Sequence, residues 1–268
     1  MRSVREVWRS VRRPRSPLLH IASDVGEGPV VILVHGIASS SETFKNLLPL
    51  LTDHYRCISI DLLGFGDSPA GKDYTVEEHV EALRRTIRSL RLRAPFTLVG
   101  HSLGALLSSR YAAIYPAQVS HLVMVSPPIY PVITDLTSRF ERAQLDAYMR
   151  AYEFLRTNKT FTIANAARIG RLLNISKIFE ISERNWDAFG KSLQNCIESQ
   201  TTIADLEAVQ VPIDVVYGSF DQFIAAGTMR AIETIHNVRV HRVEVNDHLV
   251  RPRLARAVSA AIGLRSAI

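Results

Sequence analysis

The sequence is poor in cysteine and has no long apolar run. Its two cysteines, Cys57 and Cys196, match no metal-ligand or redox spacing, so neither a disulfide framework nor a thiol role is expected. Without a disulfide framework, a reducing, cytoplasmic compartment is the expectation. The longest apolar runs, such as Val30–Val34, have strand length and fall far short of the roughly 20 residues that cross a bilayer. The sequence therefore predicts no transmembrane segment.

Net charge is also nearly absent once the first residues are set aside. The chain carries a net charge of +6, and residues 1–16 hold six arginines against one acid, Glu6. The remaining residues are close to neutral, which argues against a nucleic-acid groove lined by basic side chains. No nucleic-acid partner is expected.

The basic N-terminal extension, residues 1–16, has a helical pattern. Four apolar residues recur at helical spacing and form one stripe opposite the arginines: Val4, Val7, Trp8 and Val11. Pro14 would end the helix. Three interpretations stay open. In the first, the segment is a helix docked on the domain or a frayed tail. In the second, residues 2–15 contact an anionic membrane surface. In the third, the segment is a transit peptide that is removed.

From residue 17 onward, strand-like and helix-like segments alternate. This alternation predicts an α/β fold, with a mostly parallel central sheet and helices on both faces. Thr75 and Glu78 form a capping-box pattern that predicts a helix over 76–92, and a short helix is expected over 42–51. The expected strands are 18–22, 30–34, 56–60, 96–99, 121–125, 213–217 and 238–245.

Residues 134–207 lack a convincing strand and contain helix-like blocks at 136–157, 160–174 and 182–199. A helical insertion between the strand near 121–125 and the strand near 213–217 is most simply a lid over the carboxyl edge of the sheet. The expected organisation is therefore an α/β core formed by 17–133 and 208–268, with a helical lid at 134–207. At 268 residues with 47% hydrophobic residues, the chain is long enough for such a core.

The pentapeptide Gly100–Gly104 carries the chemistry, because it reads Gly-His-Ser-Leu-Gly between a strand-like run and a helix-compatible run. A serine on a tight strand-to-helix turn projects its hydroxyl from the sheet edge. Serine is a weak nucleophile unless a base activates it. The motif therefore predicts that Ser102 works with a base, an acid and an oxyanion hole supplied by other parts of the chain.

Those partners are expected where strands end, because ligands of open α/β sheets bind at the carboxyl ends of the strands. Asp221 follows the strand ending at Tyr217 and is the candidate acid; His248 follows the last strand and is the candidate base. The backbone N–H groups of Leu103 and Ile37 are the candidate oxyanion donors. The chain order Ser, Asp, His is the one expected of an α/β-hydrolase.

Other polar residues near these positions have structural interpretations. Asp247 is the rival acid, but its adjacency to His248 points its side chain the other way. Asp61 and Asp67 are expected to brace the loop that follows their strand, and His35 is expected to shape the oxyanion loop. His101 is expected to pack beside the nucleophile.

Taken in order, these motifs resemble the α/β-hydrolase superfamily, specifically its lid-bearing esterases, lipases and carbon–carbon bond hydrolases. The resemblance covers about residues 18–265 and rests on His35-Gly36, Asp61–Ser68, Gly100–Gly104, Gly218–Asp221 and Asp247-His248. It implies Ser102 as nucleophile, His248 as general base and then acid, and Asp221 as orienting carboxylate. Water would hydrolyse the acyl-enzyme, and no metal or organic cofactor is implied.

The expected activity is hydrolysis of a small-molecule carboxylic ester, thioester or lactone with an apolar acyl part. A serine stands where haloalkane and epoxide hydrolases of this fold carry an aspartate, which argues against both activities. Two alternatives stay open: a carbon–carbon bond hydrolase or acyltransferase with the same triad, and a binding protein with an idle triad.

Overall fold

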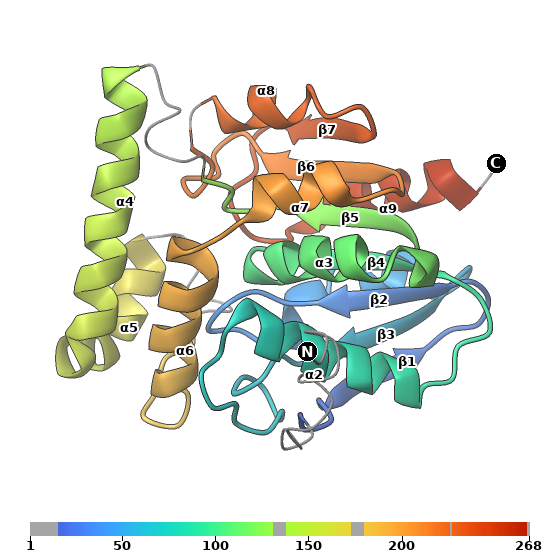
Figure 1. Ribbon diagram of the computed structural model, residues 1–268, viewed down its shortest axis with the longest axis horizontal. Coiled ribbons are helices and arrows are strands. Elements are labelled where there is room, and N and C mark those ends of the chain that lie inside the picture. The colour runs from blue at the N-terminus through green and yellow to red at the C-terminus, as the bar shows by residue number, and fades with distance from the viewer. Residues whose placement is uncertain (1–15, 131–137, 173–179, 226, 267–268) are drawn as a thin grey trace, which may run out of the picture.

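The computed structural model describes residues 16–130, 138–172, 180–225 and 227–266. A seven-stranded sheet in the order β1-β3-β2-β4-β5-β6-β7 forms its centre (Figure 1). Edge strand β1 is antiparallel to β3, and every other pair is parallel. The strands are β1 (Ile21–Val25), β2 (Val30–Val34), β3 (Arg56–Ile60), β4 (Phe96–His101), β5 (Val119–Val125), β6 (Ile213–Gly218) and β7 (Val238–Val243).

The inner strands are mostly apolar and buried because both faces of the sheet are covered. In β2 the side chains of Ile32 and Val34 join one hydrophobic core, and those of Val31 and Leu33 join a second core on the opposite face. Alternate side chains of a strand point to opposite faces, so one run of five apolar residues contributes to both cores. The mostly parallel α/β sheet expected from the sequence is confirmed.

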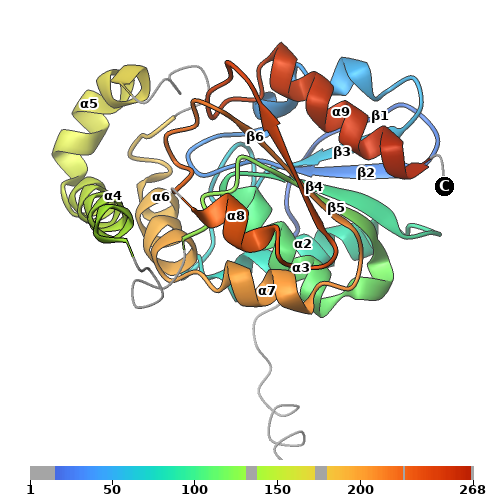
Figure 2. The ribbon, with the colours of Figure 1, turned by 90° about the horizontal axis from the view of Figure 1, so that it is seen from above.

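Helices cover the two faces, as the view from above shows (Figure 2). On one face lie α2 (Val76–Ser89), α3 (Leu103–Ile114) and α7 (Thr202–Ala208); on the other lies α9 (Pro252–Ser266). Helix α8 (Thr228–Ile232) lies between β6 and β7 in the chain, and the 3-10 turn η3 (Pro116–Gln118) leads into β5.

Only one half of the predicted capping box is formed at the start of α2. The Thr75 hydroxyl accepts a hydrogen bond from the Glu78 N–H at 3.2 Å. The Glu78 carboxylate instead accepts from the N–H groups of Lys72, Asp73 and Tyr74. The chain before Thr75 thus folds back onto the helix N-terminus, and Glu78 organises that loop.

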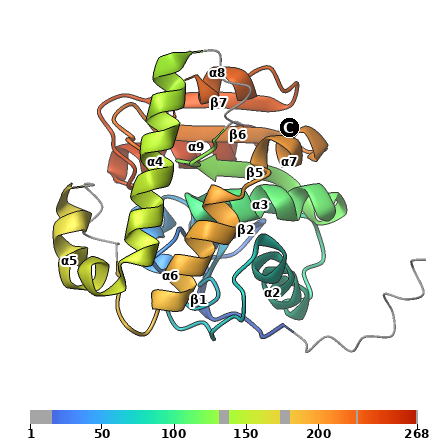
Figure 3. The same ribbon diagram turned by 60° about the vertical axis from the view of Figure 1, so that its left-hand side comes forward.

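A helical insertion lies between β5 and β6, at the end of the sheet to which the parallel strands point (Figures 1 and 3). It contains α4 (Arg139–Thr157), α5 (Lys159–Leu172) and α6 (Trp186–Ser192), with a π-helical segment η5 (Leu193–Glu198) directly after α6. The chain then returns to the face of the sheet through α7. This placement brings the inner sides of α4, α6 and η5 over the carboxyl edge of β4 and its neighbours.

Several element boundaries differ from those expected. β1 runs over Ile21–Val25 instead of 18–22. The expected helix over 42–51 is two separate 3-10 turns, Ser41–Phe44 (η1) and Leu48–Leu50 (η2). Pro49 lies at the start of η2 and has no N–H for a continuous α-helix. The expected helix over 182–199 begins only at Trp186.

The amphipathic pattern at residues 2–15 lies outside the described residues. Within the described part of the chain, none of the helices combines the length and the apolar character needed to cross a membrane. Cys57 and Cys196 are both buried free thiols.

Candidate active site

Ser102 lies on a strained turn between β4 and α3. Its φ of +53° and ψ of −121° fall in a region that costs a non-glycine residue free energy and that persists where the surrounding structure enforces it. The Ser102 N–H donates to the Val125 carbonyl at 2.9 Å, which ties the turn to β5. The serine side chain therefore stands at the carboxyl edge of the sheet, as the motif predicts.

The two motif glycines are required because backbone passes close to both. A Cβ at Gly100 would lie 2.3 Å from the Gly104 carbonyl oxygen, and a Cβ at Gly104 would lie 2.2 Å from the Val34 carbonyl oxygen. No side chain fits at either distance. The sharp turn at Ser102 therefore depends on glycine before and after it.

Asp221 and His248 meet although 27 positions separate them. Asp221 lies on the loop after β6, and His248 on the loop after β7. The His248 Nδ1 is 3.0 Å from Oδ1 and 2.9 Å from Oδ2 of Asp221. With Nδ1–H donated to the carboxylate, the Nε2 lone pair of His248 is available to accept a proton.

The Asp221 carboxylate is fully shielded from solvent, yet it favours the charged form. Burial alone would raise the pKa of Asp221, but the charge and hydrogen bonds of His248 and the Phe223 N–H outweigh it, so the pKa is lowered. The Phe223 N–H donates to Oδ1 at 3.0 Å. Asp221 is therefore an anion at neutral pH and holds the imidazole of His248 in one tautomer.

Asp247, the rival acid, faces away from His248. Its carboxylate accepts from the guanidinium of Arg251 at 2.6 to 2.9 Å and from the Leu249 N–H at 3.1 Å. It therefore braces the loop that carries His248, and it makes no hydrogen bond with the imidazole in this part of the structure.

His101 does more than pack beside Ser102. Its Nε2–H donates to the backbone carbonyl of His248 at 2.9 Å, and the two rings lie 4.9 Å apart between centroids. Burial, together with the nearby charge of His248, lowers the pKa of His101 to about 3. A neutral His101 therefore anchors the backbone of the loop that carries His248.

His35 shapes the loop after β2, as expected. Its Nδ1–H donates to the Gly36 carbonyl at 2.7 Å, and its Nε2 accepts from the Leu62 N–H at 2.9 Å. Both ring nitrogens are used, and burial lowers the pKa of His35, so the ring is held neutral. A Cβ at Gly36 would lie 2.9 Å from the Ser102 Cβ, so the loop passes directly against the nucleophile.

Asp61 braces the loop that follows β3 from a buried position. Its carboxylate accepts from the Ser41 N–H and hydroxyl, from the Asp67 N–H and from the His20 ring. These bonds hold η1 and the 61–68 loop to the sheet, which is a structural role and leaves Asp61 outside the serine site.

The two candidate oxyanion donors flank Ser102. Leu103 is the first residue of α3, so its N–H has no carbonyl partner within the helix. Ile37 is in the loop shaped by His35 and lines the same cavity as Ser102. The geometry thus brings both donors to the serine side of the sheet edge.

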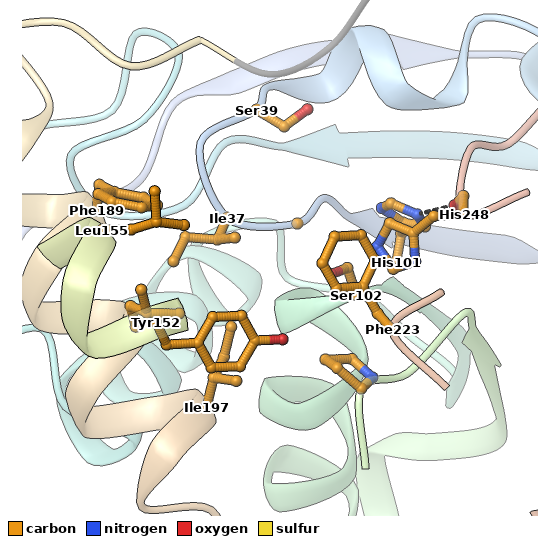
Figure 4. A pocket seen from close by; sticks show the side chains of 13 residues that line it. Ile37, Ser39, His101, Ser102, Tyr152, Leu155, Phe189, Ile197, Phe223 and His248 are labelled. Carbon is orange, nitrogen blue, oxygen red and sulfur yellow. Dashed lines mark hydrogen bonds between the residues drawn. The ribbon is translucent and has the colours of Figure 1, made fainter. Parts of the chain in front are cut away.

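Ser102 and His248 open into one narrow cavity of about 70 Å³ beneath the insertion (Figure 4). The Phe223 ring contacts the His248 ring edge-on, 4.6 Å between centroids. Most of the remaining wall is apolar. Besides Ile37, it comes from residues that the sequence did not single out: Pro128, Leu155, Phe189, Leu193 and Ile197.

Tyr152 adds a hydroxyl to this wall. Its oxygen lies 2.6 Å from that of Tyr130, and burial raises the pKa of both phenols. Tyr152 and Leu155 lie three positions apart on α4, and Leu193 and Ile197 lie four apart on η5. In the sequence these residues show only the helical spacing of apolar positions. That spacing does not indicate which face of a helix lines a cavity.

No group of His, Cys, Asp and Glu in the described ranges is arranged to hold a metal ion.

Comparisons with known proteins show the fold family of the chain. The model of the alpha/beta hydrolase fold family matches residues 29–250. The chain belongs to the α/β hydrolase fold family. The match extends from the start of β2 to just beyond His248, so it includes the Ser102 turn, the insertion and the loops of Asp221 and His248.

Curated relatives of this α/β hydrolase match part of their own length. The probable lysophospholipase BODYGUARD 4 of Arabidopsis thaliana is 29% identical over 81% of this chain and 59% of the relative. The cis-3-alkyl-4-alkyloxetan-2-one decarboxylase of Shewanella oneidensis is 36% identical over 40% of this chain and 35% of the relative. The chain thus spans less than two thirds of these relatives.

Solved structures share the fold of this α/β hydrolase at low identity. A thermophilic esterase from Thermogutta terrifontis has a TM-score of 0.71 and 23% identity, covering 92% of this chain and 94% of that chain. The enol-lactonase from Burkholderia xenovorans has a TM-score of 0.69 and 16% identity, covering 93% and 96%.

Proposed function

We propose that this α/β hydrolase cleaves a small-molecule carboxylic ester, thioester or lactone with an apolar acyl part, through an acyl-enzyme on Ser102. One observation carries the proposal: Ser102 and His248 line a single apolar cavity, and Asp221 is hydrogen-bonded to His248 behind it. Membership of the hydrolase family supports the reaction class.

In the proposed acylation, the Ser102 Oγ attacks the carbonyl carbon while His248 Nε2 takes the hydroxyl proton. Asp221 stabilises the imidazolium that forms. The tetrahedral intermediate then collapses, the bond to the leaving oxygen or sulfur breaks, and Nε2 returns the proton to the leaving group. In the second half, water attacks the acyl-enzyme with His248 as base, and Ser102 is regenerated.

The negative charge of the carbonyl oxygen in each tetrahedral intermediate would be bound by the N–H groups of Ile37 and Leu103. Such fixed donors cost no reorganisation during the reaction and are each worth about 3 kcal/mol of transition-state stabilisation. The Leu103 N–H also lies at the N-terminus of α3, whose dipole favours a developing anion.

The apolar acyl part is proposed from the cavity wall. Leu155 of α4, Phe189 of α6 and Ile197 of η5 come from the insertion. The insertion, expected at residues 134–207, is therefore proposed to act as a lid over the site. The name of one relative, a probable lysophospholipase, agrees with ester hydrolysis. Another relative is a decarboxylase whose named substrates, oxetan-2-ones, are four-membered lactones.

The proposal is tested with p-nitrophenyl esters from acetate to laurate and with a fluorophosphonate probe. The chain is expected to hydrolyse the esters and to be labelled, and Ser102→Ala is expected to abolish both. Ser109→Ala is the matched control, because Ser109 is buried in α3 and donates to the Leu106 carbonyl, away from the cavity.

Two outcomes overturn the proposal in favour of the alternatives. Turnover of a vinylogous diketone without ester turnover would assign carbon–carbon bond hydrolysis to the same triad. Absence of Ser102-dependent labelling in the folded protein would assign a binding protein with an idle triad.

A further inference from the structure

The outer face of α4 is apolar and exposed. Five residues at positions i, i+3, i+7, i+11 and i+14 form one stripe along it, and all five are exposed: Phe140, Ala143, Ala147, Ala151 and Phe154. The exposed fractions of Phe140 and Phe154 are 72% and 48%. Large contiguous apolar patches are uncommon on soluble proteins and mark interaction surfaces.

The stripe continues onto α5. The ring of Phe154 meets that of Phe161 at 5.3 Å between centroids, edge-on. Phe161 is 48% exposed and Leu172, at the end of α5, is 87% exposed. These exposed apolar residues of α4 and α5, together with the basic residues around them, are called the α4–α5 surface. In Figure 2 both helices stand at the outer edge of the molecule.

The charge of this hairpin differs from that of the rest of the domain. Residues 138–172 contain seven Lys and Arg against three Asp and Glu, a net charge of +4, whereas residues 17–137 and 173–268 together carry a net charge of −3. Four of the basic side chains are exposed beside the apolar stripe: Arg139, Arg150, Arg168 and Arg171.

The opposite side of the same helix lines the catalytic cavity. Tyr152 and Leu155 of α4 form part of the cavity wall. The Tyr148 hydroxyl, also on α4, donates to the Gln222 carbonyl in the loop that carries Asp221. One helix thus separates an outward apolar and basic surface from the site of the reaction.

We propose that the α4–α5 surface docks on an anionic lipid bilayer. Phenylalanine and leucine side chains would enter the boundary between headgroups and acyl chains, while the arginines contact the anionic headgroups. A second copy of the chain is a poorer occupant, because two hairpins of net charge +4 would face each other. Docking in this way would place α4, which forms part of the cavity wall, next to the membrane.

The test is co-sedimentation with phosphatidylcholine vesicles, with and without phosphatidylglycerol. The protein is expected to bind only the anionic vesicles, and less at high salt. The double variant Phe140→Ser/Phe154→Ser and the triple variant Arg150→Glu/Arg168→Glu/Arg171→Glu are each expected to lower the partition constant at least tenfold. Hydrolysis of a soluble acetate ester is expected to stay unchanged in both, which separates failure to dock from failure of the proposed reaction.

The matched control is Leu50→Ser/Ile114→Ser, because these residues are 41% and 49% exposed on other parts of the molecule and their loss is expected to leave vesicle binding unchanged. Equal binding by the α4–α5 variants and the wild type would overturn the proposal. So would binding that disappears only when residues 1–15 are deleted. A dimer in sedimentation equilibrium that Phe140→Ser/Phe154→Ser dissociates, without vesicle binding, would assign the surface to a second copy instead.

Discussion

At the scale of single residues, the site depends on side chains that each have one fixed set of partners. Asp221 and Asp247 illustrate this. Asp221 lies next to His248 in space, and Asp247 directly precedes it in the sequence. Only Asp221 reaches the imidazole, at 2.9 Å, whereas Asp247 is bound to Arg251. The two carboxylates therefore have different roles that a pair of matched substitutions can separate.

Asp221→Asn is expected to lower kcat by roughly 10³ to 10⁴, because an amide no longer holds His248 in the reactive tautomer. Asp247→Asn is the control and is expected to lower the melting temperature while changing kcat by less than about tenfold, because its partner Arg251 lies outside the cavity. The measurement is steady-state hydrolysis of a p-nitrophenyl ester, with circular dichroism to verify folding. Equal losses of kcat in the two variants would contradict the assignment.

His101→Phe is expected to lower kcat about tenfold and to leave KM nearly unchanged. The substitution removes the hydrogen bond to the His248 carbonyl, through which His101 is expected to position His248. His101→Gln offers a side-chain N–H to the same carbonyl and is expected to recover part of the rate. A change in KM alone, or no recovery with glutamine, would show that His101 acts on the cavity shape instead.

Ser102, Asp221 and His248 could be proposed from the sequence because each follows a recognisable strand. The residues of the cavity wall could not. Phe223 follows Asp221 by two positions, and its contact with His248 depends on the path of a loop. Leu155 and Ile197 carry ordinary helical patterns, and the side of α4 and η5 that meets the cavity is decided by packing between segments distant in sequence.

At the scale of elements, strands β2 and β3 matched their expected bounds. For β2 the signal is the continuous apolar run Val30–Val34. The prediction of one helix over 42–51 was wrong: Pro49, which is visible in the sequence, has no N–H for a continuous α-helix, and the segment forms two 3-10 turns. The π-helical segment η5 has no sequence signature of its own, because its hydrogen bonding is set by neighbours.

The loop after β2 should tolerate no side chain at Gly36. Gly36→Ala would place a Cβ 2.9 Å from the Ser102 Cβ and is expected to lower kcat/KM by at least tenfold by displacing the Ile37 N–H. Gly263→Ala is the matched control, because a Cβ there meets nothing within 4 Å. Since Gly263 lies inside α9, alanine is expected to raise the free energy of unfolding by about 0.5 to 1 kcal/mol. Unchanged activity in Gly36→Ala would contradict a role of this loop in the site.

At the scale of the whole molecule, the core and the insertion are joined through buried polar contacts as well as apolar ones. His79 of α2 is fully buried and its Nε2 lies 3.0 Å from the Ser192 hydroxyl at the end of α6. Burial lowers the pKa of His79 to about 4, below the value of about 6.5 that the unfolded chain would have. Burial of this contact therefore requires His79 to be neutral in the folded protein.

This requirement predicts a loss of stability in acid. Above pH 6.5 the histidine is neutral in both states, so its contribution to stability is complete. As the pH falls from about 6.5 to 4, the unfolded chain binds a proton that the folded chain excludes, and the free energy of unfolding decreases by up to about 1.4 kcal/mol per pH unit. His101, with a pKa lowered to about 3, adds to the same loss in the same window.

His79→Gln is therefore expected to lose less stability than the wild type between pH 7.5 and 4.5, with a difference in the change of melting temperature of roughly 5 °C. Glutamine cannot titrate but can still bond with Ser192. His54→Gln is the control, because His54 is exposed and its replacement is expected to leave the acid sensitivity unchanged. Carboxylates such as Asp214 change the free energy of unfolding only at pH values below this range. His121 and His241 lower the pKa of Asp214 to about 2, against the effect of burial. Identical melting curves of His79→Gln and wild type at both pH values would exclude His79 as a source of acid sensitivity.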